Sequence, residues 1–299
     1  MIEEVTGIRR IRMLYLQLLY RCNFECGHCF HGERLRYQDA FTSVQASNLM
    51  RLMRHEHGIE AVTLLGGEPF VYRDLARVVR YAKHDLGLAV EICTNGYRIA
   101  PRLREIASCV DLLRVSLEGI GDTNDHVRQA GSYTAALESL ALARDLGVPT
   151  GVTMTVNRYN IGEVIELARI LESLGVAQLK LHRLRPIGNA AARPEMVVRD
   201  STEYSVMREK LRRAVLNIEV VLDDDLAEGS SSSCAAPAPR REIDRIEVDP
   251  RGALTMSCKA VGTDAQAFWY EKDGDRIVHR PGPDDEVLVG IPDVVYRHA

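Results

Sequence analysis

The sequence predicts an α/β fold built on a parallel sheet, and two features support that prediction. Strand-like and helix-like hydrophobic periods alternate regularly through the first two thirds of the chain, which is typical of βα units. Glycine and polar residues directly follow several of the strand-like segments, at the end of a parallel sheet where ligands bind. We therefore expect any active site to lie at the carboxyl ends of the strands.

The predicted elements follow one another in a regular order. Buried strands are predicted at residues 13–20, 61–65, 88–94, 112–117, 149–156 and 177–182. Helices are predicted between them at residues 43–57, 72–85, 101–108, 133–146 and 162–174. Because six βα units are too few to close an eight-stranded barrel, we expect an open barrel or a wound sheet.

The regular alternation stops after Pro186. A helix is predicted at residues 203–216, followed by a loop rich in Ser, Ala and Pro at residues 229–239. Residues 245–249 and 253–258 flank Pro250-Arg251-Gly252, which is typical of a β-hairpin. The last thirty residues show no clear period. We accordingly divide the chain into a core at residues 1–189 and an extension at residues 190–299.

The composition argues against several classes of protein. The chain has 299 residues, 46% of them hydrophobic, and is long enough to bury a core without disulfides. Its longest apolar run, residues 13–20, is too short to cross a bilayer, and its N-terminus lacks the order of a signal peptide. A net charge of −4 argues against a nucleic-acid-binding protein. We expect a cytoplasmic globular protein that binds neither nucleic acid nor membrane.

Three cysteines, Cys22, Cys26 and Cys29, lie within eight residues directly after the first predicted strand. This C-x₃-C-x₂-C spacing cannot place three thiols on one face of a helix or strand, but a loop around an inorganic centre can. Three thiolates would leave one iron of a four-iron cube without a protein ligand, open to a substrate or cofactor. Two alternatives remain: a zinc site completed by His28 or His31, and a group of reduced core thiols.

The chain resembles the radical S-adenosylmethionine (radical SAM) superfamily in this cysteine triad and in further motifs along roughly its first two thirds. These motifs follow successive predicted strands: Gly66-Gly67-Glu68-Pro69, Thr94-Asn95-Gly96, Val115-Ser116-Leu117-Glu118-Gly119, Asp125-His126-Val127-Arg128 with Gly131-Ser132-Tyr133, and Leu181-His182-Arg183-Leu184-Arg185-Pro186-Ile187-Gly188. Glu118 stands where the superfamily more commonly has Asp.

The resemblance implies a partial (β/α)6 TIM-like barrel with a small C-terminal α+β extension. It implies a [4Fe-4S] cluster on Cys22, Cys26 and Cys29, with S-adenosylmethionine chelating the open iron. The S-adenosylmethionine site would be lined by His28, Gly66, Gly67, Glu68, Ser116, Arg128 and Leu184. The implied reaction is reductive cleavage to methionine and a 5′-deoxyadenosyl radical, which takes hydrogen from an unactivated substrate C–H. The implied electron donor is of the flavodoxin or ferredoxin type.

The residue types in this implied site suit a polar ligand. A glycine pair at a strand end lets the backbone approach a ligand without obstruction by Cβ. Glu68 could accept from an ammonium group or, alternatively, cap the helix at Tyr72. Ser116 suits a ribose hydroxyl, and Arg128 suits a carboxylate.

Two further cysteines, Cys234 and Cys258, bracket the predicted hairpin. By resemblance they occupy the positions of the first two ligands of a SPASM or twitch extension, which holds a second iron–sulfur cluster. No cysteine follows Cys258, so such a cluster would lack ligands. Alternatively, one of the pair delivers a hydrogen atom to the substrate radical, which inverts a stereocentre. We favour Cys258 as this donor, because it lies on a predicted strand while Cys234 lies in a loop. Cys93 and Cys109 are expected to be core residues.

In outline the chain is similar to radical SAM epimerases of aminoglycoside antibiotics. Residues 190–299 hold 15 Lys and Arg against 21 Asp and Glu, and this acidic balance suits a cationic aminosugar. Candidate acceptors for its ammonium groups are Asp223, Asp224, Asp225 and Glu228. We therefore expect epimerisation of a sugar carbon of a cationic aminoglycoside-type substrate, in antibiotic biosynthesis. The alternatives are an aminocyclitol or alcohol dehydrogenase, a ribosomal-peptide-modifying enzyme, and a metal-binding structural or regulatory protein.

Overall fold

The computed structural model describes residues 1–223, 226, 242–256 and 267–280. The chain forms two compact units, each assembled from separate segments of the sequence. The first unit consists of Met1–Cys22, Arg36–Ile92 and the described part of Ser232–Ala299. The second unit consists of Asn23–Leu35 and the described part of Cys93–Ser231.

The first unit is built on a mixed sheet with the strand order β11-β10-β9-β8-β1-β2-β3. Its strands are β1 (Arg10–Gln17), β2 (Ala61–Leu65), β3 (Ala89–Thr94), β8 (Glu242–Val248), β9 (Ala253–Thr255), β10 (Phe268–Glu271) and β11 (Arg276–His279). Strands β8, β1, β2 and β3 pair in parallel, and β8 to β11 pair antiparallel. The helices are α1 (Ile2–Thr6), α2 (Ser43–His57) and α3 (Leu75–Arg80).

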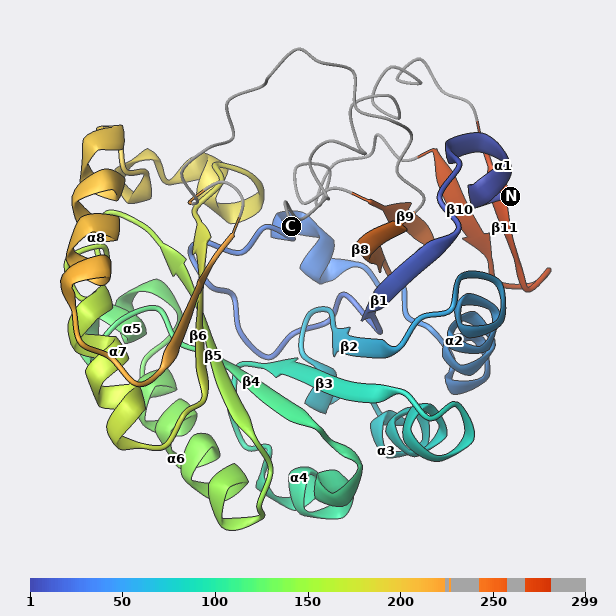
Figure 1. Ribbon diagram of the computed structural model, residues 1–299, viewed down its shortest axis with the longest axis horizontal. Coiled ribbons are helices and arrows are strands. Elements are labelled where there is room, and N and C mark those ends of the chain that lie inside the picture. The colour runs from blue at the N-terminus through green and yellow to red at the C-terminus, as the bar shows by residue number, and fades with distance from the viewer. Residues whose placement is uncertain (224–225, 227–241, 257–266, 281–299) are drawn as a thin grey trace. The chain divides into compact units, whose positions relative to one another are not determined.

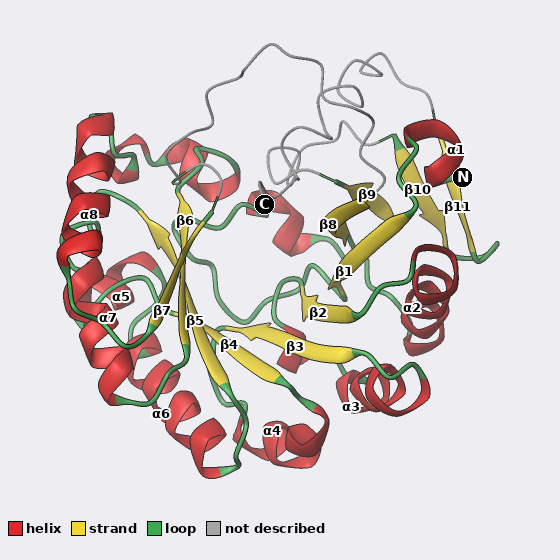
Figure 2. Cartoon of the chain, in the orientation of Figure 1, coloured by secondary structure: helices red, strands yellow, loops and turns green. Residues whose placement is uncertain are grey.

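The second unit contains four parallel strands in sequence order. They are β4 (Leu112–Ser116), β5 (Thr150–Val156), β6 (Gln178–Arg183) and β7 (Glu219–Leu222). The helices of this unit are α4 (Ala100–Ile106), α5 (Asp122–Val127), α6 (Ser132–Asp145), α7 (Val164–Ser173) and α8 (Ser201–Arg213). Helices α6, α7 and α8 run along one side of these strands (Figures 1 and 2). Alternate strand residues such as Val115, Val152, Met154 and Leu181 are fully buried, as a helix-covered sheet requires.

The structure confirms the prediction of an α/β fold whose parallel sheet does not close into a barrel. Helix α2 and strand β2 begin and end at the predicted residues. A capping box fixes the start of α2, because Thr42 Oγ1 accepts from Gln45 N at 3.2 Å while Gln45 Oε1 accepts from Thr42 N at 3.0 Å. The hairpin around Pro250-Arg251-Gly252 forms as β8 and β9. No helix in the described part of the chain combines the length and apolarity needed for a membrane span.

The helix predicted at residues 72–85 is shorter than expected. Pro69 begins a 3₁₀ turn (Pro69–Val71), and Tyr72 after it is extended, with φ −71° and ψ 119°. The α-helix therefore starts only at Leu75, and its end continues as a π-helical turn, Tyr81–Asp85. The hydrophobic pattern from Tyr72 onward could not show this break. The 3₁₀ turn that causes it begins at Pro69, ahead of the residues that carry the pattern.

Among the α-helices and strands of the described residues, five were not predicted: α1, α5, β7, β10 and β11. Each has four to six residues, which is too short for a hydrophobic period to stand out. The strands among them depend on pairing with distant parts of the chain. For example, β7 pairs with β6, and β8 of the hairpin pairs in parallel with β1.

Helices α5 and α6 are joined by the side chain of Asp125. Its Oδ2 accepts from the backbone N–H of Gly131 at 2.6 Å, and its Oδ1 accepts from Ser132 Oγ at 3.0 Å and Tyr133 N at 2.7 Å. Partial burial raises the pKa of this carboxyl, but the two N–H donors and the Ser132 hydroxyl outweigh that effect and lower it. These bonds connect the Asp125–Arg128 motif to the Gly131–Tyr133 motif in this chain.

We predict that Asp125→Ala lowers the free energy of unfolding by about 1 kcal/mol, because the first turn of α6 loses its cap. The folded-state pKa lies below the unfolded value, so the carboxylate contributes above about pH 4, and its contribution disappears as the pH falls through the lowered pKa. Urea unfolding at pH 7 and pH 3 tests this. The control, Asp122→Ala in the exposed first turn of α5, should lose only about 0.3 kcal/mol. Equal losses in both variants at pH 7 would contradict the role of Asp125.

Candidate active site

The loop that carries Cys22, Cys26 and Cys29 directly follows β1. Cys26 is buried, Cys22 and Cys29 keep part of their surface exposed, and none of the three forms a disulfide. Desolvation by surrounding protein atoms raises the pKa of the Cys29 thiol to about 11, against a smaller opposing effect of the His31 backbone N–H. This thiol therefore stays protonated at neutral pH unless a metal displaces the proton.

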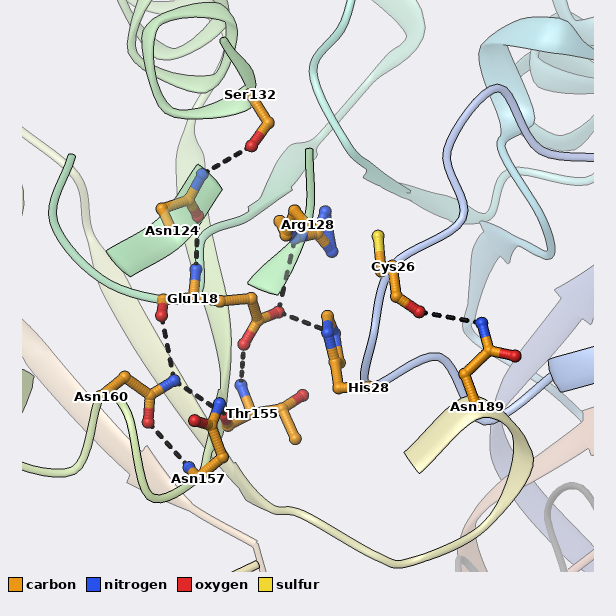
Figure 3. Close-up of polar contacts among 10 residues, drawn as sticks. All are labelled: Cys26, His28, Glu118, Asn124, Arg128, Ser132, Thr155, Asn157, Asn160 and Asn189. Carbon is orange, nitrogen blue, oxygen red and sulfur yellow. Dashed lines mark hydrogen bonds and ion pairs between the residues drawn. The ribbon is translucent and has the colours of Figure 1, made fainter. Parts of the chain in front are cut away.

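The second unit holds the cysteine loop through main-chain contacts. Gly27 N donates to the carbonyl oxygen of Val127 at 2.8 Å. Asn189 Nδ2 donates to the carbonyl of Cys26 at 2.9 Å (Figure 3), and Asn189 N donates to the carbonyl of Cys29 at 2.9 Å. The end of α5 and the turn at Gly188–Ala192 thus fix the backbone around two of the three cysteines.

Glu118, which follows β4, is the centre of a buried polar network in the same unit (Figure 3). Only 1% of its surface is exposed. Its Oε1 lies 3.1 Å from His28 Nε2 and 3.6 Å from Arg128 Nε, and its Oε2 accepts from Thr155 N at 2.6 Å. Burial alone would raise the pKa of Glu118, but His28, Arg128 and the Thr155 N–H together outweigh it and lower the pKa.

Two buried asparagines, Asn124 and Asn160, hold the backbone of Glu118, and a third, Asn157, contacts Asn160. Asn124 Oδ1 accepts from Glu118 N at 2.7 Å, and Asn160 Nδ2 donates to the Glu118 carbonyl at 3.0 Å. Asn160 Oδ1 in turn accepts from Asn157 N at 2.7 Å. The sequence did not identify these residues or Asn189 as part of the site, because no local pattern shows whether a single asparagine is exposed or buried.

The expected site residues of the second unit lie in different surroundings. Glu118 brings His28 and Arg128 together. Ser116 is the last residue of β4 and is partly exposed. Leu184 is 4% exposed and packs in an apolar cluster with Val127, Ala190 and Met196.

The Gly66-Gly67-Glu68 segment follows β2 in the first unit. A Cβ on Gly67 would lie 2.2 Å from the carbonyl oxygens of both Tyr20 and Arg21, and Gly66 has a φ of +136°. Both glycines are therefore required for the chain's own packing, in addition to any approach by a ligand. Glu68 Oε1 accepts from Phe70 N at 3.0 Å, so it caps the 3₁₀ turn at Pro69–Val71 rather than a helix at Tyr72.

Several residues singled out in the C-terminal third lie outside the described residues: Cys234, Cys258, Asp224, Asp225 and Glu228. Asp223 is described. Its Oδ2 accepts from Arg183 N at 3.1 Å and lies 3.2 Å from His182 Nδ1, while its Oδ1 accepts from Leu226 N at 3.1 Å. These contacts tie the carboxylate of Asp223 to the ends of β6 and β7.

The order of these motifs along βα units corresponds to a known family. The radical SAM superfamily matches residues 16–171, which is more than half of the chain. The chain belongs to the radical SAM superfamily. The match includes the cysteine loop, Glu118 and Arg128.

Curated relatives of this radical SAM protein match more than half of the chain. Mycofactocin maturase MftC of Mycobacterium ulcerans is 34% identical over 181 residues, which cover 58% of this chain and 48% of MftC. A probable GTP 3′,8-cyclase of Saccharolobus solfataricus is 30% identical over 184 residues, which cover 60% of this chain and 59% of the cyclase. The chain thus spans only about half the length of these relatives.

Solved structures extend the likeness in fold. The crystal structure of Streptococcus suis SuiB bound to S-adenosylmethionine has a TM-score of 0.67 at 15% identity, covering 88% of this chain and 64% of SuiB. SuiB bound to its precursor peptide SuiA gives a TM-score of 0.66 at 16% identity, covering 88% of this chain and 63% of SuiB. At this identity the likeness concerns the fold, which is a partial TIM-like barrel.

Radical SAM proteins use a [4Fe-4S] cluster and S-adenosylmethionine, and the donor set of the cysteine loop fits the cluster. Within the described ranges, no three His, Cys, Asp or Glu side chains gather around one point as ligands of a single metal ion. A cube differs from a zinc site in this respect, because each thiolate binds a different iron atom. His28, the alternative fourth zinc ligand, has its Nε2 3.1 Å from Glu118 Oε1.

We predict that Glu118→Gln lowers the free energy of unfolding by roughly 3 kcal/mol, because it leaves the buried Arg128 guanidinium beside a neutral amide. Urea unfolding of the purified variant measures this. The control, Glu138→Gln on the exposed side of α6, should change stability by less than about 0.5 kcal/mol. A loss in the Glu118 variant no larger than in the control would show that the network is not held by charge.

Proposed function

We propose that this protein reductively cleaves S-adenosylmethionine and uses the resulting carbon radical to remove hydrogen from a C–H bond of a substrate. The observation that carries this proposal is the C-x₃-C-x₂-C loop directly after β1, in a chain whose residues 16–171 match the radical SAM superfamily. The two bonds that Asn189 donates to the carbonyls of Cys26 and Cys29 support it, one from its side-chain amide and one from its backbone N–H, because a cluster-binding loop must keep its backbone in place when metal is added.

The chain's own residues would supply binding and positioning. Cys22, Cys26 and Cys29 would hold three irons of the cluster and leave the fourth open to S-adenosylmethionine. When bound, the cluster and S-adenosylmethionine together supply the electron and the carbon radical. Arg128, which Glu118 restrains, would face the methionyl carboxylate.

The remaining binding residues have more local roles. Ser116 would bind the ribose at the end of β4, and His28 and Leu184 would bound the nucleoside. The Gly66-Gly67-Glu68 segment would receive the methionyl ammonium group. A flavodoxin- or ferredoxin-type electron donor and a cytoplasmic location stay predictions.

We predict that Cys26→Ala loses both the cluster and the cleavage reaction. After anaerobic reconstitution, wild-type protein should hold about four irons per chain and form 5′-deoxyadenosine with a strong reductant, while the variant holds background iron and forms none. Cys109→Ala, at a buried cysteine 4% exposed, should retain both properties and controls for loss of a thiol in general. Wild-type protein that loads four irons without forming 5′-deoxyadenosine would contradict the proposed function.

For the substrate, we propose a cationic aminoglycoside-type sugar that is epimerised at one carbon, with Cys258 as hydrogen donor and Cys234 as the alternative donor or a cluster ligand. The acidic balance of residues 190–299 and the presence of only two cysteines there support this. A twitch-type dehydrogenase would need a second cluster, and would then hold about eight irons per chain.

We predict that Cys258→Ala still forms 5′-deoxyadenosine but no longer forms the inverted sugar. In D₂O, the wild-type enzyme should place one deuterium at the inverted carbon, because a thiol exchanges its hydrogen with solvent. Mass spectrometry of the product measures the label. An unlabelled product, or a fully active variant, would remove Cys258 from the reaction.

Peptide modification is the second candidate function. It is supported by the likeness in fold to SuiB, whose structure has been solved with the precursor peptide SuiA. The two candidate functions differ in their substrate. A peptide-modifying enzyme would alter the mass or stereochemistry of a peptide, and an epimerase would alter that of an aminosugar.

A further inference from the structure

At the middle of its parallel strands, the sheet of the first unit has apolar side chains on one face and a row of mostly polar side chains on the other. On one face, Leu14 and Leu16 of β1 lie beside Val62 and Leu64 of β2, and all four are fully buried. The other face carries a polar row in which side chains of β8, β1, β2 and β3 lie next to one another in register. The row consists of Glu247, Tyr15, Thr63 and Glu91.

Gln17 lies on this polar face, two residues beyond Tyr15, at the carboxyl end of β1. Its side chain is 3% exposed. Its Nε2 donates to Glu247 Oε1 at 2.5 Å, whereas its Oε1 is buried and accepts no hydrogen bond from any described residue. Because both atoms belong to one planar amide, the unpartnered oxygen lies beside the carboxylate of Glu247.

The charge of Glu247 is also poorly compensated. Among the described residues, no Lys, Arg or His lies within ion-pair distance of it, and Gln17 is its one hydrogen-bond donor. The nearest cation, Arg245, has its guanidinium over the ring of Tyr15, 5.2 Å from the centroid. Burial raises the pKa of Glu247. This effect is larger than the lowering effects of the Gln17 hydrogen bond and the Arg245 charge. An additional positive donor would relieve this cost.

The neighbouring carboxylate Asp249 differs from Glu247 because its oxygens already have donors. Its Oδ1 accepts from Arg251 N and Ala253 N, both at 2.9 Å, and its Oδ2 accepts from Tyr20 Oη at 2.6 Å. Asp249 therefore stabilises the β8–β9 turn. Among the described residues, the acceptor that lacks a donor is Gln17 Oε1, and the Glu247 carboxylate beside it accepts from Gln17 Nε2.

We propose that Gln17 and Glu247 bind a protonated amine of the substrate, with the ammonium group donating to Gln17 Oε1 and to the Glu247 carboxylate. The position fits, because ligands of parallel sheets lie at the carboxyl ends of the strands. This inference rests on the proposed function and names the chemical group of the substrate that the enzyme recognises. The amine would belong to an aminosugar or to a lysine of a peptide.

The test uses the anaerobically reconstituted full chain with S-adenosylmethionine, and calorimetric titration with neamine and with tetra-N-acetylneamine. Wild-type protein should bind the free amine at least about 10-fold more tightly than the acetylated form, since acetylation removes the charge. Glu247→Gln should abolish this preference, and Gln17→Met should weaken it. The control is Glu242→Gln, at an exposed carboxylate on the same strand, and it should keep the preference.

A second pair of probes distinguishes the two sources of amine. The second pair is Nα-acetyl-lysine amide and its Nε-acetylated form. If the substrate is a peptide, the protein should prefer the free amine of this pair and show no such preference with neamine. Unfolding midpoints separate binding from structure: Glu247→Gln should keep or raise the midpoint, because it removes a poorly compensated charge at a half-buried position. A purely structural carboxylate would lower it.

The outcomes separate this inference from the proposed function. If wild-type protein forms 5′-deoxyadenosine yet binds the amine and the acetylated probe of each pair with equal affinity, Gln17 and Glu247 do not bind a substrate amine. In that case Gln17 Oε1 accepts from water. The same conclusion holds if the Glu247 and Glu242 variants keep the same preference. If no 5′-deoxyadenosine forms although the amine preference is present, the proposed function fails while the amine site stands.

Discussion

The arrangement around the cysteine loop depends on one buried carboxylate, that of Glu118. With 1% of its surface exposed, the residue cannot rely on water, so its charge must be balanced by protein groups. Those groups come from separate segments: His28 from the cysteine loop, Arg128 from the end of α5 and the N–H of Thr155 from β5. The requirement to balance one charge therefore fixes a loop, a helix and two strands in relation to one another.

The buried Glu118 and the half-buried Glu247 show how its surroundings decide the role of a carboxylate. Burial opposes ionisation of both, but for Glu118 the nearby His28, Arg128 and backbone N–H outweigh it, and the pKa falls. For Glu247 the single amide of Gln17 and the more distant Arg245 do not outweigh burial, and the pKa rises. The carboxylate of Glu118 finds its partners within the chain, and its charge therefore stabilises the fold. The carboxylate of Glu247 has Gln17 as its hydrogen-bond donor among the described residues and no cation in an ion pair, which leaves it able to accept from a positively charged ligand.

Several motifs that mark the superfamily also have structural roles in this chain. Gly67 allows the segment after β2 to lie against the backbone of Tyr20 and Arg21, directly before the first cysteine. Asp125 joins α5 to α6, and thereby positions the end of α5, from which Val127 contacts the loop at Gly27. Ligand binding and chain packing thus place requirements on the same residues, so loss of activity in a variant of these motifs has to be separated from loss of folding.

The sequence by itself determined the βα alternation, the bounds of α2 and β2, and the cysteine loop after the first strand, because these depend on residues near one another in the chain. It also carried the superfamily motifs, and with them the cofactors. Only the tertiary structure decided that β8 pairs with β1 and that Asn124 and Asn160 hold Glu118. It also decided that Gln17 Oε1 receives no donor from the part of the chain that the structure describes. Strand pairing and the balance of buried polar groups join residues that are far apart in sequence, so no local pattern records them.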